Sequence, residues 1–176
     1  MSHTTFQSPF GALTLMAGAE GLRRLYFPGT APALDPAEPT APEAVATEAV
    51  LAGACAQLEE YFAGHRRTFE LPIECSGTAF QRSVWRALQE IPYGATTTYG
   101  TLGRQLGAQP RAIGAAVGST PVPIVIPCHR VIGADGSLTG YGGGLERKRA
   151  LLALEASGGE RGAFDAALRE RQLTLI

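Results

Sequence analysis

The stretch PVPIVIPCHRV, residues 121–131, decides how the second half of the chain can fold. Its three prolines fix their own φ and push each preceding residue toward extended backbone, so the approach to Cys128 cannot be helical. Cys128 therefore ends a stiff apolar segment and directly precedes His129 and Arg130. Positive charge favours a thiolate, which is the nucleophilic form of cysteine, so this order predicts a reactive thiol.

An ordinary core cysteine is the alternative for Cys128, because most free cysteines behave as small buried hydrophobic residues. His129 and Arg130 argue against this alternative, since apolar interiors rarely enclose two such groups without partners.

The composition suits one domain or two small ones, with 176 residues of which 45% are hydrophobic. The sequence has neither an apolar run of the ~20 residues that a membrane span needs nor a leader-like N-terminus, so we expect a cytoplasmic protein with no membrane association. The three cysteines, Cys55, Cys75 and Cys128, form no CxxC pair, which argues against disulfides and zinc. We expect no metal and no cofactor.

The net charge of −1 conceals an uneven distribution along the chain. Residues 1–75 carry four basic and nine acidic side chains, whereas residues 76–155 carry eight basic and four acidic ones. A basic middle segment points to a polyanionic partner, although the excess is small enough to reflect solubility alone.

The first 75 residues predict an N-terminal α+β domain without a catalytic cluster. Apolar and polar side chains alternate over residues 4–26, which is typical of a small antiparallel sheet. We expect a turn at residues 6–11, strands at 13–16 and 22–27, a proline-rich loop at 28–42, a helix at 43–62 and a further possible strand at 68–71.

Residues 76–156 predict a mostly helical domain that contains a helix-turn-helix. Thr78 can cap a first helix that ends before Pro92, and Thr98 can cap a second one at residues 99–106. After Gly107, Pro110 fits the first turn of a third helix, residues 111–117. This last helix has Arg111 at its start and then mostly Gly and Ala, which suits either close approach to a minor groove or packing against another helix.

The segment after Cys128 ends in a glycine-rich loop and a helix. Residues 139–144 place Tyr141 beside exposed backbone amides, a combination that binds flat heterocycles. The helix at residues 145–156 has Glu155 at its apolar end, where a carboxylate needs a partner if it is buried. Residues 157–176 predict a mobile C-terminal tail with a possible short helix at residues 163–171.

Together these segments resemble the O6-alkylguanine-DNA alkyltransferases. The resemblance rests on residues 127–131 with residues 121–124 and 140–144 around them, and it extends upstream through residues 80–85, 93–94, 98–100 and 111–114. An ordered series over about eighty residues is far more specific than one short motif. One position departs from the family pattern: Thr120 stands where asparagine is common, and Thr120 or Ser119 can still bond the backbone locally.

The resemblance implies a repair protein that takes one alkyl group from guanine O6 of DNA onto its own cysteine. In that case Cys128 is the acceptor, His129 takes its proton through a water molecule, and Glu155 orients His129. Tyr99 would press on the phosphate beside the lesion and help to rotate the nucleotide out of the duplex, and Arg111 would fill the vacated place. The expected DNA- and base-binding set is Arg111, Tyr99, Tyr141, Gly142, Gly143, Arg130 and Thr120.

The implied partner is double-stranded DNA that contains O6-alkylguanine, bound by a monomer, with thymine O4 as a further possible target. Because the product is a thioether that no group in the sequence can cleave, we expect one turnover per molecule. Three other functions stay open on the residues alone: a lesion-binding protein without transfer, a transcription regulator that uses the helix-turn-helix, and a cysteine hydrolase.

Overall fold

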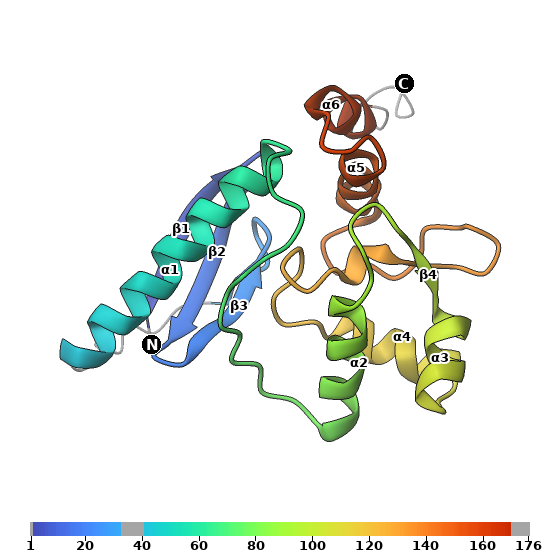
Figure 1. The fold of residues 1–176 in the computed structure, drawn as a ribbon, viewed down its shortest axis with the longest axis horizontal. Helices are drawn as coiled ribbons and strands as arrows, with labels where there is room; N and C mark the ends of the chain where they lie inside the picture. Colours follow the sequence, from blue (N-terminus) through green and yellow to red (C-terminus); the bar gives the residue numbers. More distant parts are fainter. Residues whose placement is uncertain (1, 33–40, 170–176) are drawn as a thin grey trace. The chain divides into compact units, whose positions relative to one another are not determined.

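The structure is a computed structural model that describes residues 2–32 and 41–169. The chain divides into two compact units, Met1–Ser76 and Gly77–Ile176 (Figure 1). The first contains an antiparallel sheet and one helix, and the second is largely helical, so the expected α+β fold class is confirmed. Among the described residues, no helix combines the length and the apolar character required to cross a membrane.

In the first unit, a three-stranded sheet packs against one long helix. Strands β1 (Ser2–Ser8), β2 (Gly11–Gly18) and β3 (Gly21–Tyr26) are antiparallel in the order β1-β2-β3, and helix α1 (Ala41–Phe62) lies along the sheet (Figure 1). The side chains of Leu13, Leu15 and Ala17 are fully buried, as the two-residue period of a half-covered strand requires.

Two expectations for this unit are wrong. The turn expected at residues 6–11 is shorter, because β1 continues to Ser8 while Phe6 pairs with Leu13 and stacks on Phe62 at 6.4 Å between ring centroids. Residues 68–71 form no strand, because the Glu70 amide donates to the side chain of Gln57 instead of a neighbouring strand. Of the proline-rich segment, residues 33–40 lie outside the described residues.

In the second unit, the predicted helix caps are confirmed. Helix α2 (Ala79–Gln89) begins with a capping box between Thr78 and Gln81, and the Thr98 side chain accepts the Thr101 amide at the start of α3 (Tyr99–Leu106). Gly107 then adopts φ +63°, the left-handed conformation that favours glycine at a helix end. Helix α4 (Pro110–Gly118) follows after three residues, which completes the helix-turn-helix.

The remaining elements connect the cysteine segment to the C-terminal helices. Cys128 begins a single 3-10 turn, η1 (Cys128–Arg130), and β5 (Val131–Ile132) pairs in parallel with β4 (Thr97–Thr98). This short pairing was not predicted, and it joins the start of α3 to the segment after the cysteine. Helix α5 (Leu145–Ala156) has the predicted bounds.

The approach to Cys128 contains a strained residue. Ile124 has φ +76°, a conformation that costs a β-branched residue of the order of 1–3 kcal/mol. The Ile126 amide donates to the Val122 carbonyl at 2.9 Å, which closes a tight turn around Ile124. Because Val122, Ile124 and Ile126 are almost fully buried, their packing holds this turn.

Residues 161–169 do not belong to a mobile tail. They form helix α6 (Arg161–Arg169), which packs against α5 and buries Phe164 completely. A short helix was predicted as possible at residues 163–171, of which residues 170 and 171 lie outside the described residues. The buried apolar face of α6 attaches this segment to the second unit.

We therefore expect the substitution Phe164→Ala to lower the free energy of unfolding of the second unit by about 3–5 kcal/mol, because it leaves a cavity between α5 and α6. Urea unfolding followed by the fluorescence of Trp85, the one tryptophan of the chain, measures this loss. Ala166→Ser, an exposed change on the same helix, is the control and should have little effect. Equal stability of the Phe164→Ala protein would contradict the assignment of α6 to the domain.

Candidate active site

Cys128 is buried at the first position of η1, with only 4% of its surface exposed. Its amide donates to the Ile126 carbonyl at 2.7 Å, which fixes the direction of the side chain. Burial raises the pKa of the Cys128 thiol to about 11, against the opposing effects of the Thr120 side chain and the Lys148 charge. The resting group is therefore a thiol, and its proton must be removed before the sulfur can attack.

The expectation that Arg130 activates Cys128 as a neighbouring cation is wrong, because Arg130 is committed elsewhere. Its Nε donates to Glu155 Oε2 at 2.8 Å, and its Nη2 donates to Glu155 Oε1 at 2.9 Å. Its Nη1 donates to the Ile91 carbonyl at 2.5 Å, and the residue is only 6% exposed. The same contacts argue against a role for Arg130 in binding DNA.

Glu155 accepts hydrogen bonds from two separate segments, the η1 turn and the loop after α2. In addition to the two bonds from Arg130, its Oε1 lies 2.8 Å from His129 Nε2, and its Oε2 accepts the Gly94 amide at 3.2 Å. Gly94 has φ +77°, and a Cβ there would lie 3.1 Å from the Glu155 carbonyl oxygen, so this close approach requires glycine. The sequence predicted that Glu155 needs a partner, and the structure provides His129, Arg130 and Gly94.

The protonation states of this group follow from its surroundings. Burial raises the pKa of the Glu155 carboxyl, but His129 and Arg130 outweigh this effect and lower it to about 2. Burial also lowers the pKa of His129, so its imidazole is neutral at physiological pH. Since the ionised Glu155 can only accept, Nε2 of His129 carries the hydrogen, and Nδ1 keeps a lone pair.

Nδ1 of His129 is the atom that can receive a proton. It is buried and has no hydrogen-bond partner among the described residues. Cys128, His129 and Glu155 thus correspond to a nucleophile, a base and a group that orients the base.

Tyr99 lies at the first position of α3, between the helix-turn-helix and the glycine-rich loop. Its Oη donates to the Thr139 carbonyl at 3.0 Å, and a Cβ on Gly114 of α4 would lie 3.9 Å from its ring. Arg111 is exposed at the start of α4, one turn before Gly114. The structure thus brings Tyr99 close to the helix that carries Arg111.

Tyr141 lies near the thiol, because a charge on Cys128 contributes to raising the pKa of Tyr141, after the larger effect of burial. A Cβ on Gly142 would meet no atom within 4 Å, so open space adjoins the loop there. Gly143 is buried, and its carbonyl accepts a hydrogen bond from Arg147 at 2.6 Å. Tyr141 therefore belongs to the surroundings of the cysteine.

Thr120 makes the local bond that the sequence suggested: its hydroxyl donates to the Val117 carbonyl at 2.7 Å, and Ser119 does the same to Ala116 at 2.9 Å. The influence of Thr120 on the pKa of Cys128 places this side chain beside the thiol. Thr120 therefore contacts the cysteine segment.

Lys148, which is fully buried in α5, was not predicted from the sequence as a residue of this region. A signal was present, because Lys148 precedes Leu151 by three residues and Glu155 by seven, which places all three on one face of the helix. Leu151 and Glu155 are also buried.

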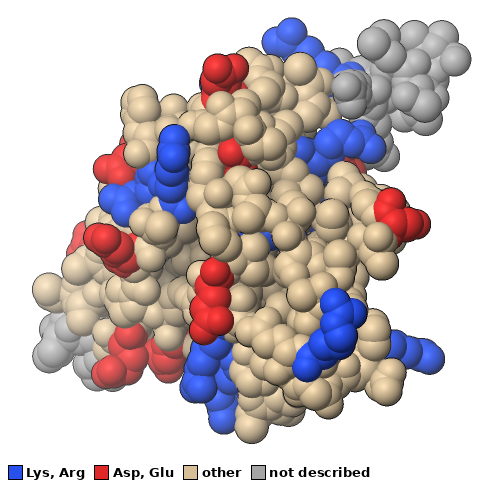
Figure 2. All heavy atoms as spheres, turned by 45° about the vertical axis from the view of Figure 1, so that its right-hand side comes forward, with Lys and Arg blue, Asp and Glu red and all other residues tan. Residues whose placement is uncertain are grey.

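The helices near the site carry a basic surface. Within their bounds, α2, α3 and α4 contain no acidic residue and four exposed arginines, Arg82, Arg86, Arg104 and Arg111. Figure 2 shows basic side chains over the lower part of this unit, where Figure 1 draws these helices. Such a surface can bind phosphates. Among the described residues, no group of three or more His, Cys, Asp or Glu could hold a metal ion.

Comparisons with protein families cover both units. Residues 79–157 match the family described as 6-O-methylguanine DNA methyltransferase, DNA binding domain. Residues 1–75 match the 6-O-methylguanine DNA methyltransferase, ribonuclease-like domain.

Individual relatives agree with these matches. A methylated-DNA–protein-cysteine methyltransferase of Mycolicibacterium paratuberculosis is 47% identical over 158 residues, which cover 88% of this chain and 92% of that protein. One from Methanosarcina acetivorans is 42% identical over 160 residues, or 89% and 99% of the two chains. The crystal structure of Mycobacterium tuberculosis OGT in complex with DNA has a TM-score of 0.79 and 42% identity, and the match covers 94% of this chain and 98% of that one.

The pKa of Glu155 predicts how acid affects the second unit. Because folding depresses this pKa from 4.5 to about 2, the ionised carboxylate contributes about 3 kcal/mol above pH 4.5 and loses that contribution as the pH falls toward 2. Glu155→Gln should therefore be much less stable than the unsubstituted protein at neutral pH, and the difference should shrink below about pH 4.5.

Urea unfolding at a series of pH values, followed by Trp85 fluorescence, measures this difference. Glu160→Gln, which changes an exposed carboxylate just beyond α5, is the control and should leave stability almost unchanged at every pH. A Glu155→Gln deficit that stays constant from neutral to acid pH would contradict the assignment of an ionised, paired Glu155.

Proposed function

Because the chain belongs to the 6-O-methylguanine DNA methyltransferase family, we propose that Cys128 is the residue onto which it transfers the alkyl group. The chain is a methylated-DNA–protein-cysteine methyltransferase that acts in DNA repair, and DNA is its partner. The observation that carries the assignment to Cys128 is the buried pair of His129 and Glu155, 2.8 Å apart, directly after this cysteine. Neither Cys55 nor Cys75 is followed by a histidine.

The reaction begins with a proton transfer. Since the pKa of the Cys128 thiol is raised to about 11, little thiolate exists at neutral pH, and a base must take the proton. Nδ1 of neutral His129 is that base, acting directly or through a water molecule. The carboxylate of Glu155 stabilises the imidazolium that forms, because its Oε1 accepts the Nε2 hydrogen.

The alkyl transfer follows as a displacement at carbon. A bond forms between Cys128 Sγ and the alkyl carbon, while the bond between that carbon and guanine O6 breaks. The electron pair of the broken bond leaves with the guanine, which takes up the proton that His129 received from the thiol. The products are unmodified guanine and a thioether on Cys128, so each molecule reacts once.

The target base has to leave the duplex, because an alkyl group on O6 lies inside the base stack. We assign the rotation to Tyr99 and the filling of the vacated place to Arg111, which lies at the start of a helix whose small residues permit close approach to a minor groove. Tyr141 and the amides of Gly142 and Gly143 would form the base pocket, and the exposed arginines of α2–α4 would hold the phosphates.

We further propose that the protein acts on O6-alkylguanine in double-stranded DNA, as a monomer, in the cytoplasm. The expected selectivity follows from the site, because the displacement needs an alkylated oxygen on a flat base that can be extruded. The three cysteines are free thiols, which fits a reducing compartment.

The test is to incubate the protein with a duplex that contains one O6-methylguanine and to weigh the intact chain and its peptides. We expect Cys128 to gain the mass of one methylene group. The reaction should stop once each protein molecule has reacted with one molecule of the methylated duplex. Cys128→Ser should gain nothing, whereas Cys75→Ser, the matched control, should react normally. Methylation at another residue, or continued turnover, would contradict the proposal, and lesion binding without transfer would instead indicate a lesion-binding protein.

A further inference from the structure

The loop that contains Tyr141 is rich in glycine, so contacts with other residues have to fix its conformation. Four of the six residues 139–144 are glycine. Glycine loses more backbone freedom than any other residue when a segment becomes ordered. A pocket built from the amides of Gly142 and Gly143 therefore needs anchors that hold this loop before a base arrives.

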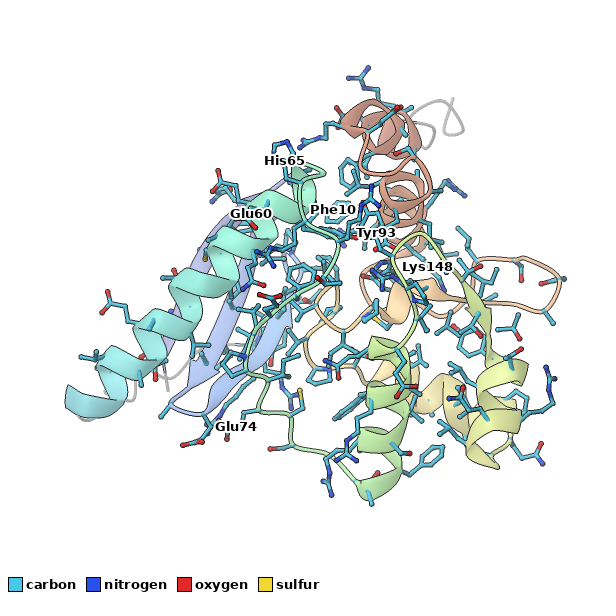
Figure 3. All side chains as sticks on the ribbon, viewed as in Figure 1. Phe10, Glu60, His65, Glu74, Tyr93 and Lys148 are labelled. Carbon is cyan, nitrogen blue, oxygen red and sulfur yellow. The ribbon has the colours of Figure 1, made fainter. Side chains whose placement is uncertain are left out.

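The start of the loop is held at the Thr139 carbonyl. This oxygen accepts hydrogen bonds from Tyr99 Oη at 3.0 Å and from Lys148 Nζ at 2.7 Å. Figure 3 labels Lys148 at α5, directly after Arg147 in the chain. Neither of these bonds reaches the glycines that follow Tyr141, so that part of the loop depends on a different contact.

The peptide group between Gly143 and Gly144 is held on both sides. Its N–H, which belongs to Gly144, donates to the Tyr141 carbonyl at 3.0 Å and closes a tight turn over residues 141–144. Its carbonyl, which belongs to Gly143, accepts a hydrogen bond from Arg147 Nη1 at 2.6 Å. Arg147 therefore fixes the orientation of this peptide group from outside the turn.

The turn leaves the amides of Gly142 and Gly143 available to a ligand. In the described part of the chain, neither amide donates a hydrogen bond to a protein acceptor. Gly143 is nevertheless buried, and a buried backbone N–H without an acceptor is rare in folded proteins. These two donors fit a ligand that presents acceptor atoms, such as the N7 and O6 atoms of guanine.

The position of Arg147 is unfavourable for the stability of α5 itself. Gly144 is the N-cap of this helix, so Arg147 is its third residue, where the positive end of the helix dipole disfavours a cation. Capping boxes place Glu or Gln at this position. Arginine therefore has another role here, and its bond to the Gly143 carbonyl provides one.

The guanidinium group of Arg147 also lies near Tyr141. Burial raises the pKa of Tyr141 well above its usual value and a charge on Cys128 raises it further, whereas the charge of Arg147 lowers it. Arg147 is partly buried, which agrees with a side chain that lies against the loop.

We propose that Arg147 is a positioning residue that holds the glycine-rich loop in the form that binds the extruded base, so that it sets the affinity for this base and not the rate of transfer. The inference rests on the proposed function, in which Tyr141, Gly142 and Gly143 form the base pocket. Arginine suits this task because its planar, rigid group of donors loses little freedom when it binds a carbonyl in a fixed direction.

Amide hydrogen exchange in the absence of DNA tests the anchor itself. Arg147→Met keeps an apolar stem but removes the donors, and Arg147→Lys keeps a donor and the charge. Arg149→Met, an exposed change two residues further along α5, is the matched control. We expect the amides of residues 141–144, followed by peptide mass, to exchange about fivefold faster in Arg147→Met, with much of the protection restored in Arg147→Lys. Equal exchange in Arg147→Met and the unsubstituted protein would overturn the proposal.

Single-turnover transfer from a duplex that contains one O6-methylguanine tests the consequence for the reaction. In Arg147→Met the half-saturating duplex concentration should rise about tenfold, while the rate at saturation should stay within about twofold of that of the unsubstituted protein. Arg147→Lys should lie between these two proteins, and Arg149→Met should match the unsubstituted one. The affinity for the same duplex with unmodified guanine should be equal in all of them.

Two kinetic results would overturn the proposal. A lower rate at saturation with an unchanged half-saturating concentration would mean that Arg147 acts on the transfer step. An equal loss of affinity for the unmodified duplex would mean that Arg147 binds a phosphate.

The exchange measurement separates this inference from the proposed function. If the unsubstituted protein failed to methylate Cys128 but Arg147→Met still exchanged faster, the proposed function would be wrong while the hold of Arg147 on the loop would stand. If Arg147→Met does not fold, as judged by circular dichroism, Arg147→Gln takes its place in both measurements.

Discussion

The carboxylate of Glu155 is the contact on which the site depends. It accepts hydrogen bonds from His129, from Arg130 twice and from the Gly94 amide, at distances between 2.8 and 3.2 Å. These donors come from the turn that carries Cys128 and from the loop after α2, so one buried carboxylate joins three segments that are distant in sequence. Removing it would leave Arg130 buried without its partner and His129 without a fixed orientation.

The same carboxylate determines how charge is distributed around the cysteine. Glu155 neutralises Arg130 and directs the hydrogen of His129 to Nε2, which leaves Nδ1 available as a base. The cationic neighbour in sequence, Arg130, is therefore paired with Glu155 and does not activate the thiol. The thiol stays protonated at rest because burial raises its pKa. A thiol of this kind resists adventitious alkylation, which suits a protein that can react only once.

Local sequence patterns predicted most of the helices of the second unit. They did not predict which residues that are distant in sequence contact one another. Caps such as Thr98 and Gly107 fix helix ends through bonds within a few residues, and the helix bounds were accordingly confirmed. Glu155 was suspected from its place on an apolar face. The commitment of Arg130 to Glu155 and the strained φ of Ile124 arise only from tertiary packing, so sequence patterns do not reveal them.

The central claim is that Glu155 holds His129 as a neutral imidazole with its hydrogen on Nε2. Nitrogen-15 NMR of the histidine side chains, with Glu155→Gln to identify the His129 signals by their change, tests this claim most directly. At neutral pH the account predicts a protonated Nε2 and an unprotonated Nδ1 for His129. A hydrogen on Nδ1, or a doubly protonated ring, would contradict it, because no lone pair would then be available to receive the proton of Cys128.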